Sequence, residues 1–241
     1  MTIETNHSLS ADCVIIGFNG LELKVLLIEN RESQDGTRRN KLPGAMILEN
    51  ETLPDAAKRI LADMTGLKDI ELKQTYIYSN PDRVGDSDLE WINRNHGVRS
   101  QRVVTVGYYA LIKLNSATIK HTTKRGAYWC SIDDVGQLMM DHNKILSDTL
   151  NILKMETSQF PIAFNLLPKH FTLRAVQDLY GAILSVNIDK RNFRRKLLSS
   201  GLLTPTNKKE VGVAHKPATY YTFNYVEYNR LLRGGVKLRF Y

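Results

Sequence analysis

The chain has 241 residues, of which 42% are hydrophobic, enough to bury one large core or two modest ones and to exclude general disorder. Its net charge of +8 is unevenly distributed: residues 160–241 contain 14 Lys and Arg against 4 Asp and Glu, which leaves 19 against 21 in residues 1–159. This asymmetry favours a phosphate-binding module joined to a near-neutral domain. The sequence has neither a long apolar run nor a signal-peptide pattern, so we expect a cytoplasmic protein without a membrane span.

The two cysteines, Cys13 and Cys130, both lie in apolar, strand-like segments. Neither has a second Cys or a His at the spacing that metal ligands require, and a reducing compartment disfavours disulfides. We therefore expect both thiols to be reduced residues of the core, with no role as metal ligands.

The first expected elements are two strands, at residues 12–18 and 23–29. Both runs are rich in β-branched and other apolar residues, which favours extended structure. Asn19-Gly20 lies between them, and this dipeptide is typical of tight hairpin turns. The chain is therefore expected to open with an antiparallel pair of strands.

A helix is expected next, over residues 56–67, because its apolar residues recur at intervals of three and four. Thr52 or Asp55 can cap the N-terminus of this helix, and Gly66 is a suitable residue to end it. The pattern predicts one amphipathic helix that packs an apolar face against the strands.

Three more strands are expected before the end of the first half, at residues 71–78, 102–114 and 127–132. The long polar segment 80–101 separates the first two of these strands. Its central part predicts a small helix that ends at Gly97. We interpret this segment as a functional or interface excursion, because structureless loops of such length are uncommon in compact domains.

The first half is expected to end with a helix at residues 143–155, followed by the polar run Thr157–Gln159. We place the boundary in this polar run. The predicted domains are therefore residues 1–157 and residues 160–241.

The second half has a different pattern. Thr172 is positioned to cap a helix that extends to about Leu184, and Asp189 is positioned to cap a second, strongly basic helix. Two strand-like segments, 202–206 and 218–223, then flank a polar stretch. Helix, short turn, basic helix and hairpin is the layout of a winged helix-turn-helix domain.

The basic helix is the candidate nucleic-acid contact. No acidic residue lies between positions 190 and 200, so its cations repel one another in the isolated helix. Binding to a polyanion turns this unfavourable repulsion into a favourable interaction, because such cations displace counterions from phosphates and Arg can bind guanine edges. The alternative is an ordinary solvated helix face. The candidate residues of this helix are Lys190, Arg191, Asn192, Arg194 and Arg195.

Further candidate DNA contacts lie outside this helix. Thr172 and Arg174 begin the preceding helix, and the polar stretch between the two strands holds a basic hairpin tip. Such a tip can contact the DNA backbone or the minor groove, although loop tips are also often basic for solubility. The candidate residues of the tip are Lys208, Lys209, His215 and Lys216.

The helix of the first domain resembles a Nudix box, which reads G, five residues, E, seven residues, then R-E-apolar-x-E-E-x-G-apolar. The positions that match are Glu51, Arg59, Leu61, Gly66 and Leu67. Ala45 replaces the first glycine, and Ile60, Asp63 and Met64 replace the three glutamates of the helix. Those glutamates would hold divalent ions, which need several hard oxygen ligands. We therefore expect neither catalytic residues nor a metal or other cofactor, and we expect Glu51 and Arg59 to pair and brace the loop against the helix.

The whole chain resembles the NrtR-type Nudix-related transcriptional regulators, and within them the sugar-responsive AraR-like branch of Bacteroidetes. The segments that carry the resemblance are DCVIIGFN, DAAKRILADMTGL, VVTVGYYALI, FNLLPKHFTL and DKRNFRRKL. The resemblance implies an α+β fold: a Nudix-like mixed-sheet α/β/α sandwich followed by a winged helix-turn-helix domain. It also implies a homodimer that binds a palindromic DNA operator and releases it when a small-molecule effector binds the Nudix-like domain.

The expected function is thus a ligand-responsive repressor that senses a sugar or an NAD-related metabolite such as ADP-ribose. An active Nudix hydrolase of a nucleoside diphosphate derivative is the main alternative, and an RNA-binding protein is a third reading, disfavoured because no aromatic stacking platform is evident. The candidate effector contacts are Arg31, Glu51, Arg59 and Arg102, with Arg38 and Arg39 nearby.

Overall fold

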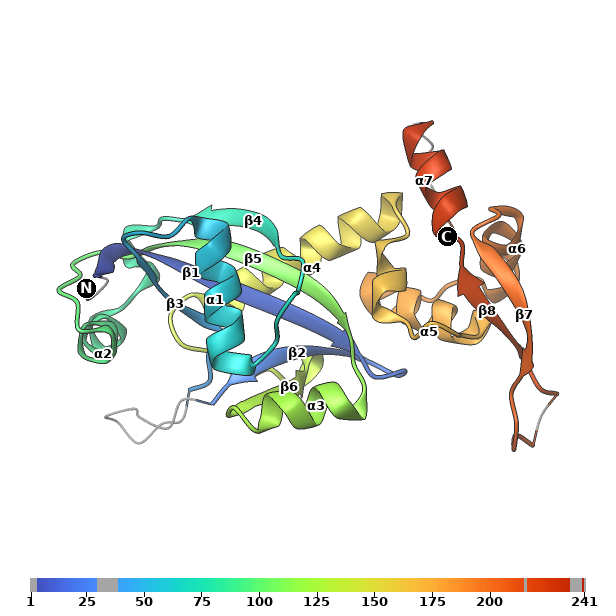
Figure 1. Ribbon diagram of the computed structural model, residues 1–241, viewed down its shortest axis with the longest axis horizontal. Helices are drawn as coiled ribbons and strands as arrows, with labels where there is room; N and C mark the ends of the chain where they lie inside the picture. The colour runs from blue at the N-terminus through green and yellow to red at the C-terminus, as the bar shows by residue number, and fades with distance from the viewer. Residues whose placement is uncertain (1–3, 30–38, 215, 235–239, 241) are drawn as a thin grey trace. The chain divides into compact units, whose positions relative to one another are not determined.

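The computed structural model describes residues 4–29, 39–214, 216–234 and 240 (Figure 1). The chain forms two compact units, which we describe separately. The first comprises Met1–Gly17 and Lys24–Thr149, and the second comprises Phe18–Leu23 and Leu150–Tyr241. Within the described residues, no helix has the length and apolar character that a membrane span requires.

The first unit is built on a six-stranded sheet with the order β4-β5-β1-β2-β6, in which β3 also pairs with β1. Every residue of β1 from Ser10 to Phe18 is buried, which is the pattern of a strand covered on both faces. The strands are β1 (Thr5–Phe18), β2 (Leu23–Ile28), β3 (Gly44–Leu48), β4 (Lys73–Tyr78), β5 (Val104–Lys113) and β6 (Ala127–Ser131).

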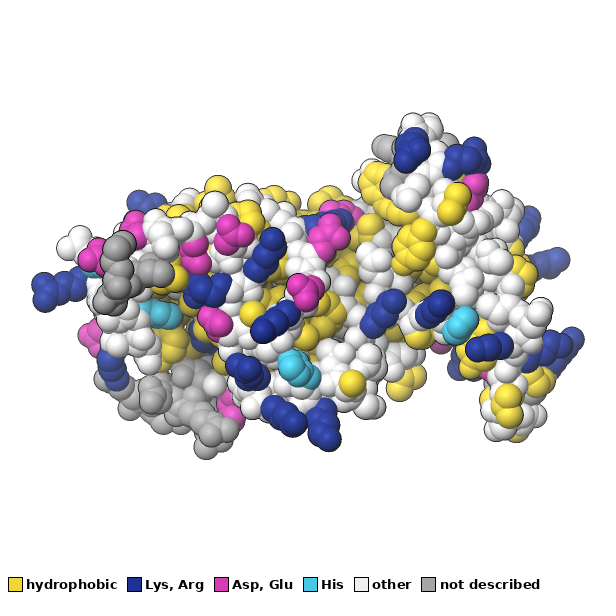
Figure 2. Space-filling view, in the orientation of Figure 1, with side chains coloured by type: hydrophobic (Ala, Val, Ile, Leu, Met, Phe, Trp, Pro, Cys, Tyr) yellow, Lys and Arg dark blue, Asp and Glu magenta, His cyan; other side chains and the backbone are white. Residues whose placement is uncertain are grey.

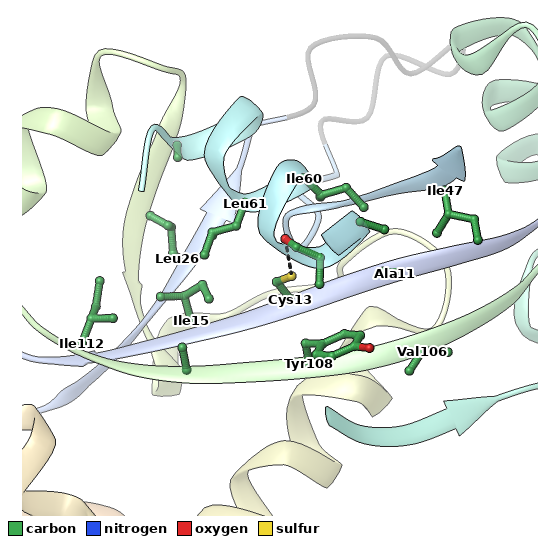
Figure 3. Packing of buried hydrophobic residues seen from close by; sticks show 14 residues of the cluster. Ala11, Cys13, Ile15, Leu26, Ile47, Ile60, Leu61, Val106, Tyr108 and Ile112 are labelled. Atoms are coloured by element: carbon green, nitrogen blue, oxygen red, sulfur yellow. Dashed lines mark hydrogen bonds between the residues drawn. The ribbon is translucent and has the colours of Figure 1, made fainter. Parts of the chain in front are cut away.

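Helix α1 (Leu53–Thr65) confirms the predicted amphipathic helix. The Thr52 side chain caps its N-terminus by accepting a hydrogen bond from the backbone N–H of Asp55, and Gly66 ends it with φ at 77°, in the left-handed region. Its buried face packs on β1, where Cys13 and Ile15 belong to the same apolar cluster as Ile60 (Figure 3). This cluster fixes α1 against one face of the sheet.

The other helical segments lie between strands or follow the last strand, β6, and the last of them extends from the first unit into the second. The helix expected within the 80–101 excursion is confirmed, and it ends at Gly97. The helix expected at 143–155 is longer than predicted and continues past Thr157, so the expected domain boundary falls in its last turn. The segments are η1 (Pro81–Arg83), α2 (Asp86–His96), α3 (Ser116–Thr123), η2 (Ile132–Asp134) and α4 (His142–Gln159).

Besides the short helix η1, a strand and a helix of the first unit were not predicted. Strand β3 lies in the segment that we expected to be a loop, and it pairs with β1. Helix α3 is rich in β-branched residues, which disfavour helix. It forms because the Asn115 side chain caps it at Thr118, and because the Trp129 Nε1 donates a hydrogen bond of 3.1 Å to Thr122 Oγ1. The local cap and one tertiary hydrogen bond thus outweigh the low helix propensity of the β-branched residues.

The cysteine prediction is confirmed for Cys13, which is fully buried and directs its thiol toward the carbonyl oxygen of Ala57 (Figure 3). Cys130 is also reduced, with no disulfide to Cys13, but it is only partly buried. The reason is its position on β6, which forms one edge of the sheet and therefore has a neighbouring strand on one side only.

The second unit has the predicted winged-helix layout. Its core is aromatic: Tyr180 is in ring contact with Phe193 and Phe240, and Phe164 stacks against Phe223. Helix α7 follows the hairpin and was not predicted; its N-terminus is capped by the Asn224 side chain, which accepts from the backbone N–H of Glu227. The elements are η3 (Ile162–Leu166), α5 (Leu173–Leu184), α6 (Lys190–Ser199), β7 (Leu203–Lys209), β8 (Thr219–Phe223) and α7 (Tyr225–Arg233).

Candidate nucleic-acid interface and ligand pocket

Helix α6 presents the basic face that the sequence predicts. The Asp189 side chain caps it by accepting hydrogen bonds from the backbone N–H groups of Arg191 and Asn192, at 3.0 and 3.2 Å. Phe193 and Leu197 point into the aromatic core and are 1% and 0% exposed. Because these two residues fix the rotation of the helix, its cations project into solvent.

Most of these cations have no acidic partner. Lys190, Arg191 and Arg194 are exposed, and among the described residues no carboxylate lies within ion-pairing distance of them. Arg195 donates a hydrogen bond of 2.7 Å to the Asn192 side chain one turn earlier, which orients both groups on the same face. Lys and Arg side chains dominate this end of the chain in Figure 2, whereas Asp and Glu side chains gather over the Nudix-like part.

Two contacts proposed at the start of α5 differ in what their side chains do. Thr172 is buried, and its hydroxyl accepts a hydrogen bond of 3.2 Å from the backbone N–H of Ala175 as the helix cap. Arg174 is exposed and lies 3.6 Å from Asp178. Together with Lys190 and Arg194 it lines a shallow depression between α5 and α6. The side chain of Thr172 therefore has a structural task, while Arg174 adds to the basic face.

The hairpin tip is basic, as expected. Lys208 and Lys209 end β7 and are exposed, and Lys216 is exposed on the other side of the tip. Glu210 closes its base, because its backbone N–H donates to the Ala218 carbonyl and its carboxylate accepts from the Ala218 N–H. His215 lies outside the described residues.

The predicted pair of Glu51 and Arg59 is confirmed. Arg59 donates two hydrogen bonds to the Glu51 carboxylate, of 2.8 Å from Nε and 2.5 Å from Nη2, and its Nη2 also reaches the Met46 carbonyl at 3.3 Å. Glu51 accepts a further bond of 2.8 Å from the backbone N–H of Leu48. The pair thus connects the end of β3 to α1. The Glu51 carboxylate and the Arg59 guanidinium are both engaged in these structural hydrogen bonds.

Replacing Glu51 tests the value of this brace. The hydrogen bonds from Arg59 hold the pKa of Glu51 below its ordinary value of 4.5, so the pair stabilises the fold above about pH 4.5 and loses that effect as pH falls further. We expect Glu51→Gln to lower the free energy of unfolding by about 1 kcal/mol at pH 7, because the pair is partly exposed. Urea unfolding at pH 7 and pH 3 would show the difference from wild type shrinking at pH 3. The exposed Glu71→Gln is the matched control, and an equal loss in both variants would contradict the brace.

The remaining positions of the Nudix box do not fit a metal site. Ile60 is 1% exposed and belongs to the apolar core, so a glutamate at this position would be buried among apolar side chains. Met64 packs against the same cluster, and Asp63 lies on the exposed side, 3.8 Å from Arg59. Among the described residues, no three His, Cys, Asp or Glu side chains gather as metal ligands would. The residues at positions 60, 63 and 64 therefore do not provide the set of carboxylates that a Nudix metal site needs.

The other candidate effector contacts lie apart from this pair. Arg102 donates a hydrogen bond of 2.7 Å to the Ser79 carbonyl at the end of β4. Arg39 forms an ion pair of 3.0 Å with Asp88 of α2. Arg31 and Arg38 lie outside the described residues.

A pocket that the sequence analysis missed lies in the first unit, between β1, the start of β3, α2 and the start of α4. Its cavity volume is about 20 Å³, which is room for about one water molecule. Polar and charged groups line it together with Met46, Ile92 and Val103. Its polar and aromatic lining includes Asp12, Lys41, Arg83, Trp91 and His142.

Three charged groups that line this pocket, Asp12, Lys41 and Arg83, are buried, and the partly buried Asp141 pairs with Arg83 beside it. Arg83 donates to the Asp141 carboxylate at 2.7 and 3.0 Å and lies 3.8 Å from Asp12. Asp12 also accepts a hydrogen bond of 2.7 Å from Thr105. Lys41 donates to the Gly44 carbonyl at 2.7 Å, and burial lowers its pKa to about 8. Two cations and two carboxylates therefore balance when Lys41 is protonated.

Gly44 is required by this arrangement. A Cβ atom at this position would lie 1.7 Å from the Asp12 carboxylate. The absence of a side chain therefore lets the start of β3 approach Asp12 closely. The Nudix box expects its first glycine one residue later in this alignment, where Ala45 stands, and Gly44 serves the close approach instead.

Comparison with known proteins places these features in context. Residues 163–223 match the family described as the NrtR DNA-binding winged helix domain. A curated relative, the ADPR responsive transcriptional repressor NtrR of Acinetobacter baylyi, is 25% identical over 225 residues, which cover 92% of this chain and 84% of the relative.

Solved structures show similarity over both units. Shewanella oneidensis NrtR superposes with a TM-score of 0.70 at 25% identity, covering 90% of this chain and 94% of that one. The same protein complexed with a 27mer DNA gives a TM-score of 0.70 at 23% identity, over 92% and 95% of the two chains. A MutT/nudix family protein from Enterococcus faecalis gives a TM-score of 0.61 at 22% identity, over 91% and 88%.

The fold is therefore a Nudix-like domain followed by a winged helix domain, an architecture that this chain shares with the two-domain structures above. The matches to the winged helix family, to the Acinetobacter repressor and to Shewanella NrtR together support the NrtR-type family of transcriptional regulators for this chain.

Proposed function

We propose that this protein is a ligand-responsive, DNA-binding transcriptional repressor whose Nudix-like domain senses an effector and does not catalyse hydrolysis. The proposal assigns effector sensing to residues 1–157 and DNA binding to residues 160–241. It places the protein in the cytoplasm as a homodimer on a palindromic operator, because twofold symmetry doubles the contacts of a single winged helix.

The observation that carries the proposal is the set of exposed, acid-free cations on a helix whose rotation the core fixes. Lys190, Arg191 and Arg194 face solvent because Phe193 and Leu197 face the core. A helix held this way can enter the major groove with its cations toward phosphates and base edges. The candidate contacts on this surface are Arg174, Lys190, Arg191, Asn192, Arg194, Arg195, Lys208, Lys209 and Lys216, whereas Thr172 is buried as the cap of α5.

The absence of catalysis is supported by the chemistry of α1. Two of the three glutamates that hold divalent ions in a Nudix box are apolar here, and Glu51 is bound by Arg59. The Acinetobacter baylyi relative is named for its response to ADPR, which supports an NAD-related effector. The resemblance of the sequence to the AraR-like branch supports a sugar instead. Sugars and NAD-related metabolites are therefore both candidate effectors of this chain.

The test combines DNA selection with a hydrolysis assay. We expect the purified full chain to enrich a palindromic duplex from a random DNA library and to prefer it over structured RNA. Incubation with ADP-ribose and Mg²⁺ or Mn²⁺ should release no AMP. AMP release at an ordinary enzyme rate, on the order of 1–10³ s⁻¹, would favour the alternative of an active hydrolase. Failure to enrich any duplex, with the protein folded, would contradict the repressor.

A further inference from the structure

Helices α5 and α6 pack against each other in the second unit and leave a depression between them. The rings of Tyr180 on α5 and Phe193 on α6 lie 5.3 Å apart between centroids and hold the two helices together. The depression has a volume of about 300 Å³, much more than one water molecule needs. Its lining consists of Arg174, Gln177, Asp178, Lys190 and Arg194.

The charged side chains of this depression are not balanced. Arg174, Lys190 and Arg194 contribute three positive charges and Asp178 one negative charge, which leaves a net charge of +2. Within the described part of the chain, the one printed ion pair among them joins Arg174 Nε to Asp178 Oδ2 at 3.6 Å. This distance is too long for a good hydrogen bond. The depression therefore attracts an anion, and the loose pair can open to admit it.

Gln177 is the buried polar residue of the depression. It is 8% exposed, and its Oε1 is buried without a hydrogen-bond partner among the described residues. An unsatisfied buried acceptor is unfavourable, so native proteins retain such groups mainly where another group satisfies them. The donors beside it in the depression are the three cations. Gln177 can therefore accept a hydrogen bond from a cation that turns inward toward a bound anion.

The two helices indicate which anion this is. In helix-turn-helix proteins the second helix enters the major groove, and the first helix crosses the sugar–phosphate backbone. Lys190 and Arg194 are one turn apart on α6, and Arg174 and Asp178 are one turn apart on α5. A depression lined by both helices is thus placed to meet the backbone, and a phosphodiester is the anion that it would meet.

We propose that this depression holds one phosphate of the operator backbone, that Gln177 is a positioning residue for the surrounding cations, and that Asp178 is an internal competitor which the phosphate displaces from Arg174. The inference rests on the proposed function, because the phosphate belongs to the operator. It adds two residues of α5, Gln177 and Asp178, to the DNA-binding surface. Phosphate contacts carry no direct sequence information, so both residues act equally on every duplex.

The first test is Gln177→Leu in the full chain, which removes the amide and keeps a similar volume. Because an unsatisfied buried acceptor is lost, the variant should melt at the wild-type temperature or above it. Its affinity for the selected operator and for a scrambled duplex should fall by the same factor, about fivefold. A purely structural role would give the reverse, a lower melting temperature with unchanged affinity. Gln137→Leu, at an exposed position of the first unit, is the matched control and should change neither quantity.

The second test is Asp178→Asn, which keeps the size of the side chain and removes its charge. Arg174 then has no competing carboxylate, so both duplexes should bind more tightly by the same factor, about two- to fivefold at low salt. This gain should be smaller in the Arg174→Ala background, because the cation that Asp178 restrains is absent. Glu227→Gln is the matched control, since it removes the same charge from an ion pair with Arg230 on α7. It should tighten binding less than Asp178→Asn does.

The phosphate is located with operator duplexes in which single phosphates are replaced by uncharged methylphosphonates. At one position in each half-site, the replacement should weaken wild-type binding and leave Gln177→Leu no further effect. The proposal is overturned if both α5 variants bind the two duplexes as the wild type does, or if either variant changes the preference for a particular base pair. Inorganic phosphate that raises the wild-type melting temperature, with DNA affinity unchanged in both variants, would assign the depression to a free anion instead.

Failure of the proposed function gives a different result. A folded wild type that binds no duplex rejects the repressor itself. A wild type that binds its operator, with variants that bind it equally well, retains the repressor and rejects this phosphate site.

Discussion

The Arg194→Ala/Arg195→Ala double variant is expected to lose specific operator binding by at least about 100-fold at moderate salt. Each Arg that reads a guanine edge contributes about 1–3 kcal/mol of discrimination, and phosphate contacts add a salt-dependent term. Both side chains are exposed on the face of α6 opposite Phe193 and Leu197, so their removal leaves the core intact. Fluorescence anisotropy with the selected operator duplex measures the affinity.

The control for this variant must remove the same charge elsewhere. Lys120→Ala/Lys124→Ala does so, because both residues are exposed at α3 in the first unit. Circular dichroism and a thermal melt should show wild-type folding for both double variants. If the control loses as much affinity as the α6 variant, total charge explains the binding. Retained operator affinity in the α6 variant would reject α6 as the recognition helix.

The basic helix α6 could be predicted because its determinants are local. Asp189 caps the helix by accepting hydrogen bonds from the backbone N–H groups two and three residues later in the chain. The two buried residues, Phe193 and Leu197, are four positions apart. These signals lie within ten residues of sequence, so one chain suffices to identify the helix and the direction of its basic face. The same holds for the pairing of Glu51 with Arg59, which the Nudix-like spacing indicated.

The pocket could not be predicted because its determinants are distant in sequence. Asp12 lies on β1, Lys41 precedes β3, Arg83 ends η1, and His142 begins α4. Only the sheet topology brings them together, and a single sequence contains no record of such contacts. One signal was available: Asp12 is a carboxylate at the start of an apolar run, where a charge is expected to be buried with a partner.

Our second large prediction concerns the salt dependence and symmetry of DNA binding. We expect a dimer in solution whose two recognition helices lie about 34 Å apart, or a multiple of that distance, to match successive major grooves on one side of a palindrome. If each half neutralises three to five phosphates, log K should fall against log salt with a slope of roughly −5 to −9. Sedimentation and anisotropy titrations at several salt concentrations measure both. A monomer with a slope near −2 would contradict the dimeric arrangement.

The effector must then act through a difference in affinity between two arrangements of this dimer. A molecule that binds the operator-bound and free forms equally well cannot shift the equilibrium. By reciprocity, operator DNA should weaken effector binding by the same factor by which the effector weakens operator binding, typically about 5–150-fold. Titration calorimetry of the effector, with and without saturating operator, measures one arm, and anisotropy with and without effector measures the other. Equal factors in both arms would show that the Nudix-like domain is a sensor. If the protein is dimeric and the effector affinity does not change when operator is present, the Nudix-like domain has a structural role and is not a sensor.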